Sequence, residues 1–282
     1  MSDLIRLAAL VFLAVTCVVI GDTAGKLLTQ DGIDPIIVAW TRFGLAAITL
    51  LPFSGLTRSD LLQLTDWRVL LRACFIAGGI CCILTALRSE PIANVFGAFF
   101  IGPIVSYILA IIFLGERPTH SRGILLAIGF AGVMLVVKPG VGVSIGMLFA
   151  LAAGVFYGAY LMMTRLVASD FRPRFLLISQ LLVGTVILAP PALISEIPAF
   201  DINVAALICL SALGSAIGNY MLVIANRQGE ASLIAPLVYS QLVSATVIGV
   251  LVFNEWPDLM STVGLILIAL SGLGSLWFYQ RR

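Results

Sequence analysis

The sequence predicts an all-α membrane protein with ten transmembrane helices, arranged as two inverted five-helix repeats with both termini on the cytoplasmic side. Three observations lead to this prediction. Apolar residues make up 61% of the 282 positions and charged residues only 11%, whereas a soluble domain has about 25% charged residues. Ten apolar segments approach the roughly 20 residues that a spanning helix needs. The chain also repeats itself at an interval of 139 residues.

The predicted helices follow one another closely along the chain, and short connections rich in glycine, proline and aspartate separate them. Backbone polar groups must be satisfied within a bilayer, and segments of this length are too long for barrel strands, so they are predicted to be helices. In order they are Ile5–Leu27, Ile36–Leu51, Val69–Leu87, Ile92–Leu114, Gly123–Val137, Ile145–Val167, Phe175–Ile194, Val204–Ala225, Ser232–Phe253 and Leu259–Tyr279.

The internal repeat is clearest at a Glu-x-Pro motif between the fourth and fifth helix of each half. A repeat near half the chain length indicates two copies of one unit, which we place at residues 1–138 and 139–282. Three residue pairs share the offset of 139: Glu116 with Glu255, Pro118 with Pro257, and Lys26 with Arg165.

Basic residues are distributed unequally between the two sides of the predicted membrane. With the N-terminus inside, the inner side holds twelve: Arg6, Arg58, Arg68, Arg72, Arg117, Arg122, Arg165, Arg172, Arg174, Arg227, Arg281 and Arg282. The outer side holds three, Lys26, Arg88 and Lys138. Cytoplasmic loops carry the excess of basic residues, so both termini are predicted to be cytoplasmic. Five helices per repeat then insert the second copy upside down, as is typical of transporters that alternate access.

Several motifs resemble one known family over nearly the whole chain. They are Arg42 early in the second helix, Pro103 in the fourth, Ala235-Pro236-Leu237-x-Tyr239-x-Gln241 in the ninth, and the joint Phe253-Asn254-Glu255-x-Pro257. With them the chain resembles the drug/metabolite transporter superfamily in its EamA-type branch, with Asn254 where that family commonly has glycine. The resemblance implies helices around a central cavity. Characterised members of that branch include bacterial inner-membrane exporters of amino acids and related metabolites, aromatic amino acids among them, and the chain resembles these more than it resembles sugar-phosphate carriers.

We therefore predict a secondary active or facilitative transporter that exports small amphipathic metabolites by alternating access, with amino acids as the favoured substrates. The alternatives are a carrier of drugs or of other metabolites, such as purines or S-adenosylmethionine, and a channel, which is less favoured. An enzyme would need paired carboxylates, histidines spaced for a metal or a Ser/Lys dyad at one depth, and the sequence shows none.

The same composition defines the expected partners. We expect a small-molecule substrate and membrane lipid as partners, no nucleic acid, and a monomer or homodimer in a bacterial inner membrane. No metal or organic cofactor is expected, because no cluster of cysteine, histidine and carboxylate residues has a suitable spacing.

Polar and aromatic residues inside the apolar segments are the candidates for a substrate site near the middle of the bilayer. Aromatic walls with sparse polar groups suit a small amphipathic ligand. The predicted lining consists of Phe99, Tyr157, Tyr160, Asn219, Tyr220, Tyr239 and Gln241. Arg42 lies about two turns into its helix, where a charge usually faces protein or a water-filled cavity. It would bind a substrate carboxylate or hold a gate, or else serve the fold by meeting backbone carbonyls.

The remaining intramembrane charges are interpreted as gate or fold residues. Asp22 and Lys26 are four residues apart on one helix face. They would form an outer gate or a proton-coupling site, although an ion pair between them at the membrane interface is the favoured interpretation. Glu116 and Glu255 precede apolar helices and have proline two residues on, so both are predicted to be structural caps.

Overall fold

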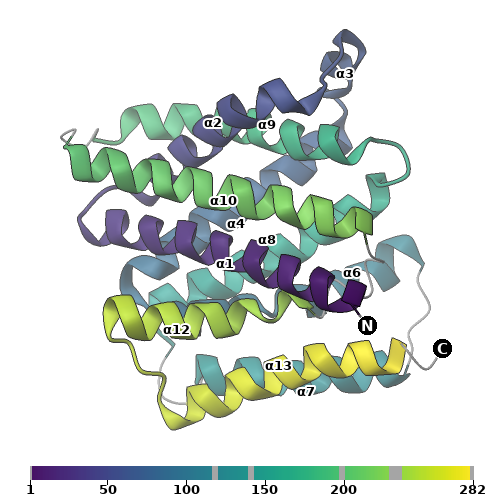
Figure 1. Ribbon diagram of the computed structural model, residues 1–282, viewed down its shortest axis with the longest axis vertical. Helices are drawn as coiled ribbons and strands as arrows, with labels where there is room; N and C mark the ends of the chain where they lie inside the picture. Colours follow the sequence, from purple (N-terminus) through teal and green to yellow (C-terminus); the bar gives the residue numbers. More distant parts are fainter. Residues whose placement is uncertain (1, 116–119, 139–142, 197–200, 229–236, 280–282) are drawn as a thin grey trace.

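The computed structural model describes residues 2–115, 120–138, 143–196, 201–228 and 237–279, and these residues form helices and no strand (Figure 1). Helix lies within all ten predicted apolar segments. In chain order the helices are α1 (Ser2–Gln30), α2 (Pro35–Ser54), α3 (Arg58–Gln63), α4 (Trp67–Ser89), α5 (Ile92–Phe99), α6 (Gly102–Leu114), α7 (His120–Val137), α8 (Ile145–Val167), α9 (Pro173–Ile194), α10 (Ile202–Gln228), α12 (Gln241–Phe253) and α13 (Leu259–Tyr279).

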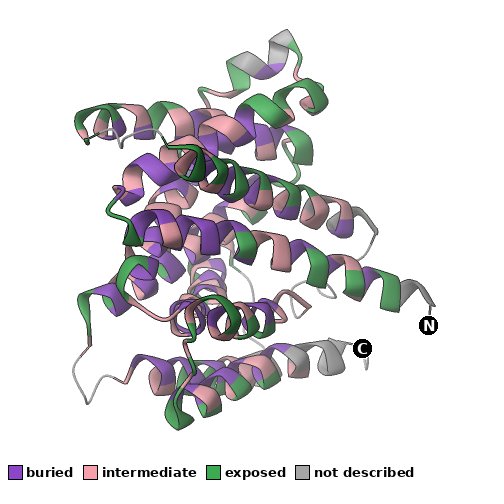
Figure 2. Ribbon diagram, turned by 60° about the vertical axis from the view of Figure 1, so that its left-hand side comes forward, coloured by how far each residue is buried: buried purple, intermediate pink, exposed green. Residues whose placement is uncertain are grey.

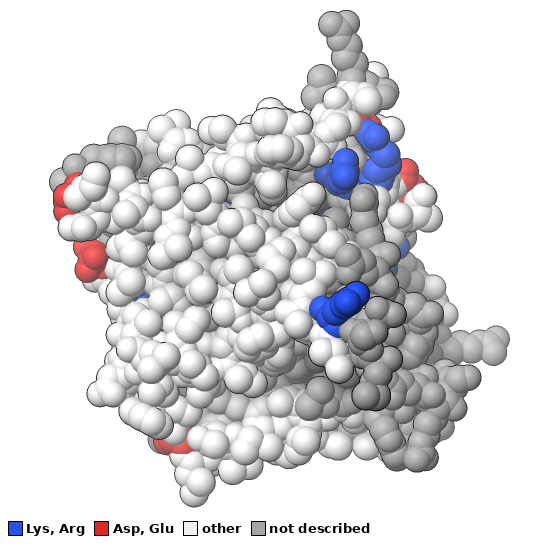
Figure 3. All heavy atoms as spheres, in the orientation of Figure 1, with Lys and Arg blue, Asp and Glu red and all other residues white. Residues whose placement is uncertain are grey.

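Seven stretches of the described chain are long and apolar enough to cross a membrane, and three further apolar helices are shorter. The long helices run side by side, with both chain ends toward the same end of the bundle (Figure 1). On the face drawn in Figure 3, charged side chains lie toward the two ends of the helices, and the wide area between them is uncharged. Large apolar side chains on several helices, such as Ile48, Ile112 and Val186, are exposed, as a lipid-facing surface requires.

Local sequence explains where the helices begin and end. The Asp34 carboxylate accepts a hydrogen bond from the Ile36 amide at 2.8 Å and so caps the start of α2, where Pro35 occupies the first turn. Asp66 caps α4 in the same way, since it accepts from the Arg68 amide at 2.8 Å. Ser144 caps α8, its hydroxyl accepting from the Met147 amide. Each cap satisfies an amide that has no partner within the helix.

The fourth predicted segment is broken, which the sequence interpretation did not anticipate. α5 ends at Phe99 and α6 begins at Gly102, so Phe100 and Ile101 form a short link between them. Pro103 has no amide hydrogen to continue the helical ladder, and its neighbours Ile104 and Val105 both donate to the carbonyl of Ile101. The Gly-Pro step therefore turns one spanning segment into two shorter helices.

The second half repeats this irregularity at the same offset. Its chain turns at Tyr239 and Ser240 before α12 begins, 139 residues after the link at Phe100 and Ile101. Gly115 ends α6 with φ 66° and Asn254 ends α12 with φ 54°, again 139 residues apart. Glycine and asparagine are the residues that adopt this left-handed conformation at least cost.

Helix packing follows the same correspondence between the halves. α1 packs along α10, and α8 packs along α4, while α2 pairs with α9 and α7 with α13. Glycines allow the close approach: a Cβ on Gly21 would lie 2.8 Å from the Ser211 carbonyl oxygen, and one on Gly158 would lie 2.6 Å from that of Gly102. Buried residues line the facing sides of these helices and exposed ones the outside (Figure 2). The small residues thus set the helix spacing.

Candidate functional site

Six aromatic side chains meet where the two halves of the chain approach each other. This aromatic cluster consists of Phe96, Phe99, Phe100, Tyr157, Tyr160 and Tyr239. The ring centroids of Phe99 and Tyr157 are 4.8 Å apart, and those of Phe100 and Tyr239 are 4.6 Å apart. Phe100 and Tyr239 occupy equivalent positions in the repeat, at the two helix breaks. The cluster therefore joins the halves at their irregular backbone.

The structure brings only part of the predicted lining together. Phe99, Tyr157, Tyr160 and Tyr239 belong to the aromatic cluster, and Gln241 is buried at the start of α12 two residues from Tyr239. The other two predicted residues lie on α10. The Asn219 amide donates to the Ser215 carbonyl of its own helix at 2.8 Å. Tyr220 is 38% exposed and borders a shallow groove with Leu50 and Phe53 of α2. The structure thus places Tyr220 away from the cluster.

The clustered part of the predicted lining makes contacts between rings: Phe99 contacts Tyr157, Tyr157 contacts Tyr160, and Tyr239 contacts Phe100. A cavity of about 400 Å³ lies elsewhere, at the end of α2 and the start of α9, with Ser54, Gly55, Arg172, Pro173 and Arg174 around it. In this conformation the aromatic rings fill the region where the sequence places the substrate.

A buried arginine adjoins the aromatic cluster. The Arg72 side chain is 3% exposed, and its three nitrogens donate to the Thr164 hydroxyl, the Leu176 carbonyl and the Tyr160 hydroxyl at 2.7 to 2.8 Å. The guanidinium also lies over the Tyr160 ring, 4.6 Å from its centroid. The Tyr160 hydroxyl in turn donates to the Gln180 side chain at 2.9 Å.

Sequence reasoning missed this role of Arg72 because it counted the residue among the basic groups of the inner surface. The available signal was that Arg72 falls inside the predicted helix Val69–Leu87. Gln180 was likewise overlooked, although it lies within the predicted helix Phe175–Ile194.

Arg42 has a different environment. Its guanidinium donates to the Asp22 carboxylate at 2.6 Å, and both side chains are 5% exposed. The Nε of Arg42 is buried without a hydrogen-bond partner. The carboxylate that meets Arg42 in this structure therefore comes from α1 of the same half.

The predicted ion pair between Asp22 and Lys26 is not formed, because each side chain has another partner. Asp22 is occupied by Arg42. Lys26 is fully buried, forms an ion pair with Glu255, and donates to the Glu90 carbonyl at 2.8 Å. The Lys26 ammonium also lies 4.5 Å from the centre of the Phe253 ring. Lys26 thus links α1 to the ends of α4 and α12.

Glu255 is a cap, although it does not cap the helix that follows it. One carboxylate oxygen accepts from the Ile92 amide at 2.9 Å and so caps α5 in the other half. The start of α13 is capped by Asp258, which accepts from the Ser261 amide at 2.8 Å. The expectation for Glu255 is corrected in this respect, because the chain reverses between α12 and α13 and turns its carboxylate toward α5. Glu116 lies outside the described residues.

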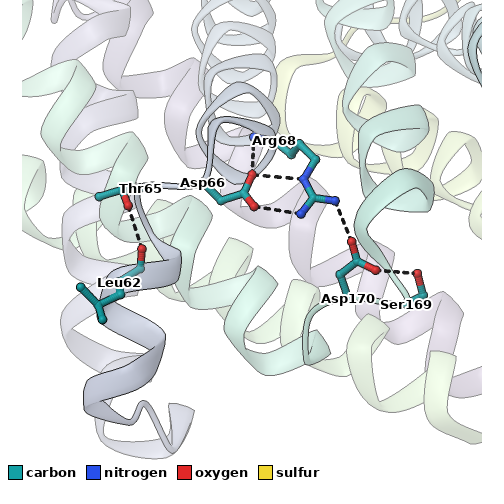
Figure 4. Close-up of polar contacts among 6 residues, drawn as sticks. All are labelled: Leu62, Thr65, Asp66, Arg68, Ser169 and Asp170. Atoms are coloured by element: carbon teal, nitrogen blue, oxygen red, sulfur yellow. Dashed lines mark hydrogen bonds and ion pairs between the residues drawn. The ribbon is translucent and has the colours of Figure 1, made fainter.

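At the opposite end of the bundle, an ion-pair network joins the start of α4 to the turn after α8 (Figure 4). Arg68 pairs with Asp66 at 2.9 Å and with Asp170 at 2.6 Å, and its guanidinium lies 5.6 Å from the centre of the Phe171 ring. The hydrogen bonds from Arg68 lower the pKa of the Asp66 and Asp170 carboxyls. We refer to this side of the molecule as the Arg68 end, and to the side with Lys26 and Glu255 as the Lys26 end.

Long apolar helices, an uncharged flank and an interior that holds buried charges and aromatic rings define an integral membrane protein. The chain belongs to the EamA-like transporter family, whose pattern matches residues 6–138 and again residues 144–277. It is thus a membrane transporter of the drug/metabolite type, and the resemblance drawn from its motifs is confirmed.

Relatives with assigned names are similar to most of the chain. An S-adenosylmethionine uptake transporter of Rickettsia bellii is 26% identical over 237 residues, which covers 82% of this chain and 80% of that protein. A riboflavin transporter of Rhizobium johnstonii is 26% identical over 223 residues, covering 78% and 73%. A solved crystal structure superposes with a TM-score of 0.65 at 18% identity, over 97% of this chain and 98% of its own. That likeness concerns the fold alone.

Proposed function

We propose that this protein is a secondary transporter of small amphipathic metabolites that carry an aromatic or heteroaromatic ring, and that it works by alternating access. The aromatic cluster is the observation on which the proposal rests. Stacked or edge-to-face aromatic pairs each contribute roughly 0.5–1.5 kcal/mol beyond the area they bury. When substrate binds, the rings that contact one another in this conformation would contact the substrate ring instead.

The substrate class combines the sequence prediction with the names of the relatives. Amino acids, aromatic ones included, are the substrates that the sequence favoured, with export as the favoured direction. The relatives are named for S-adenosylmethionine and riboflavin, both of which contain a planar heteroaromatic ring. A ring with polar substituents is common to the aromatic amino acids and these two compounds, so we propose that the ring is what the cluster recognises.

Alternating access is supported by the correspondence between the halves. In the repeat, α1 corresponds to α8 and α4 corresponds to α10, so the α1–α10 contact is equivalent to the α8–α4 contact. The helix breaks of both halves meet in the aromatic cluster. Discontinuous helices at the interface of two inverted repeats are typical of such transporters. We accordingly propose ten membrane crossings in two inverted units, residues 1–138 and 139–282.

The orientation of the protein is part of the same proposal. We place the Arg68 end and both termini in the cytoplasm, because that end holds most of the basic residues, and we place the chain in a bacterial inner membrane. Reporter fusions after Lys138 and after Arg282 should then report opposite sides of the membrane. Two reporters on the same side would contradict this topology.

Counterflow in proteoliposomes tests the transport function directly. Among tryptophan, S-adenosylmethionine and riboflavin, at least one compound should show counterflow, with preloaded vesicles accumulating the same compound in labelled form, whereas vesicles preloaded with alanine should accumulate no labelled alanine. Accumulation requires a carrier that alternates between sides and is independent of the physiological direction. Equal counterflow of alanine, or none of any ring compound, would reject the proposal.

Substitutions in the cluster test its role. Tyr157→Ala and Tyr239→Ala should each reduce transport of the active ring compound about tenfold, since each removes one stacking partner and the area it buries. Tyr220→Ala is the matched control, because that tyrosine lies apart from the cluster and should leave transport unchanged. If Tyr220→Ala is impaired as much as Tyr239→Ala, the site lies elsewhere.

A further inference from the structure

Arg72 combines deep burial with a lack of any acidic partner. Its side chain is 3% exposed, yet the three groups that accept its hydrogen bonds are a hydroxyl of Thr164, a carbonyl of Leu176 and the phenol of Tyr160. Within the described part of the chain, no ion pair includes Arg72. A buried charge is costly unless an opposite charge or several hydrogen bonds compensate it, and here only neutral groups do so.

The neighbouring arginine on the same helix shows the contrast. Arg68 lies one turn nearer the end of α4 and is paired with two carboxylates, Asp66 and Asp170. Acidic groups are therefore available in this part of the bundle, but they compensate the arginine that is closer to the surface. The positive charge of Arg72 remains uncompensated by any described carboxylate.

Arg72 lies beside the aromatic cluster, in which we place the ring of the substrate. Arg72 lies on the face of Tyr160, whose ring stacks on that of Tyr157 at 5.9 Å, and the tilted ring of Phe99 is 4.8 Å from Tyr157. A guanidinium has five N–H groups, and the described hydrogen bonds account for three of them. Two remain for a further acceptor.

We infer that Arg72 is the anion-binding residue of the transport site and selects ring-bearing substrates that also carry a carboxylate. The inference rests on the proposed function for the location of the ring. The substrate ring would lie among the aromatic cluster and its carboxylate beside Arg72, where guanidinium and carboxylate form charge-assisted hydrogen bonds. Aromatic amino acids and S-adenosylmethionine have such a group, whereas riboflavin does not.

From the sequence, Arg42 was a candidate for binding a substrate carboxylate, and we now assign that role to Arg72. Arg42 already binds the Asp22 carboxylate, so a substrate anion there would have to displace a partner on the protein itself. Arg72 requires no such exchange with the described residues, because those that accept its hydrogen bonds are all neutral.

A pair of probes that differ in charge alone tests the inference by calorimetry on the purified full-length protein. Indole-3-propionate and indole-3-propanamide have the same ring and nearly the same shape. The wild-type protein should bind the acid at least about tenfold more tightly than the amide, as expected for a charge-assisted hydrogen bond. Equal affinity for the two probes, or no binding of the acid at its solubility limit, would overturn the inference.

Variants then assign the preference to Arg72. Arg72→Gln should bring the ratio of acid to amide affinity close to one, and Arg72→Lys, which keeps the charge, should retain part of it. Arg68→Gln is the matched control and should leave the ratio unchanged, because that arginine is already paired. A preference that persists in folded Arg72→Gln protein would overturn the assignment.

The outcomes separate this inference from the proposed function. If the wild type discriminates between the two probes but shows no counterflow of any ring compound, the anion site stands and the transport proposal fails. If riboflavin is carried and both probes bind equally, the transport proposal stands and the role of Arg72 is refuted.

Discussion

Arg42 and Arg72 are both buried among the helices of this transporter, and their surroundings differ. Arg42 on α2 binds the carboxylate of Asp22 at 2.6 Å. Arg72 on α4 binds three neutral oxygens and the face of a tyrosine. The first charge is compensated by a carboxylate, whereas the second has no ion-pair partner among the described residues. Burial alone therefore does not distinguish a structural arginine from one that is available to a ligand, but the identity of its partners does.

The two arginines also differ in which parts of the molecule they connect. Arg42 and Asp22 join α1 to α2 within one half of the chain. Arg72 joins α4 to α8 and α9, which belong to the other half. The compensated pair thus connects helices within one unit, while Arg72 connects helices of the two units.

The largest effect is expected from removing the acidic partner of Arg42. Asp22→Leu leaves Arg42 buried without a counter-charge and should destabilise the protein by about 3–5 kcal/mol. The double variant Asp22→Leu with Arg42→Met removes both charges and should recover most of that loss. The measurement is the thermal midpoint and yield of purified protein. A single variant as stable as the wild type would show that the pair is not an essential charge compensation.

Removal of Arg72 should destabilise the protein less than removal of Asp22. Arg72→Met leaves neutral groups behind. We therefore expect it to lower the free energy of unfolding by about 1–3 kcal/mol, because hydrogen bonds are lost. The Tyr160 hydroxyl keeps Gln180, and the Thr164 hydroxyl keeps the Tyr160 carbonyl at 2.7 Å. The same thermal measurement serves as the test. If Arg72→Met is more damaging than Asp22→Leu, the distinction between the two arginines is wrong.

The Lys26 end provides an intermediate case. Glu255→Gln keeps an oxygen for the Ile92 amide but removes the charge that faces buried Lys26, whereas the Lys26 bond to the Glu90 carbonyl remains. Because Glu255 is 21% exposed, we expect a loss of about 1–2 kcal/mol, which is more than an ordinary helix cap provides. The control is Lys26→Met combined with Glu255→Gln, which should be more stable than Glu255→Gln alone. Equal stability of the two variants would show that the loss in Glu255→Gln does not come from the unpaired charge of Lys26.

The smallest effect is expected at the surface network around Arg68. The pKa of Asp66 and Asp170 is lowered in the folded protein from the ordinary value of 3.8. Their contribution is therefore complete above that value and is lost as the pH falls through the lower folded pKa values. Between pH 7 and pH 5 the difference in thermal midpoint between wild type and Asp170→Asn should stay constant, and it should shrink below pH 4. A difference that changes near neutral pH would require another titrating group.

Much of the fold was predictable because its signals are local. Apolar length gave the helical segments, and Ile145–Val167 and Leu259–Tyr279 match the observed helices residue for residue. Gly21 and Gly158, each four residues from another glycine in the sequence, lie at close contacts between helices. The break at Phe100 was missed, since an apolar run that contains Gly102 and Pro103 still has the composition of one spanning helix.

The sequence by itself determined the membrane class, the 139-residue repeat, the family and the aromatic character of the interior, because each depends on composition or on spacing along one helix. Only the tertiary structure decided the partners of the buried charges. Asp22 lies four residues before Lys26 on its own helix, but its carboxylate pairs with Arg42 of α2. Lys26 then reaches Glu255, 229 residues away. Charge pairing acts through space at a few ångströms, so no spacing in the sequence can distinguish the arginine that is neutralised from the one that is not.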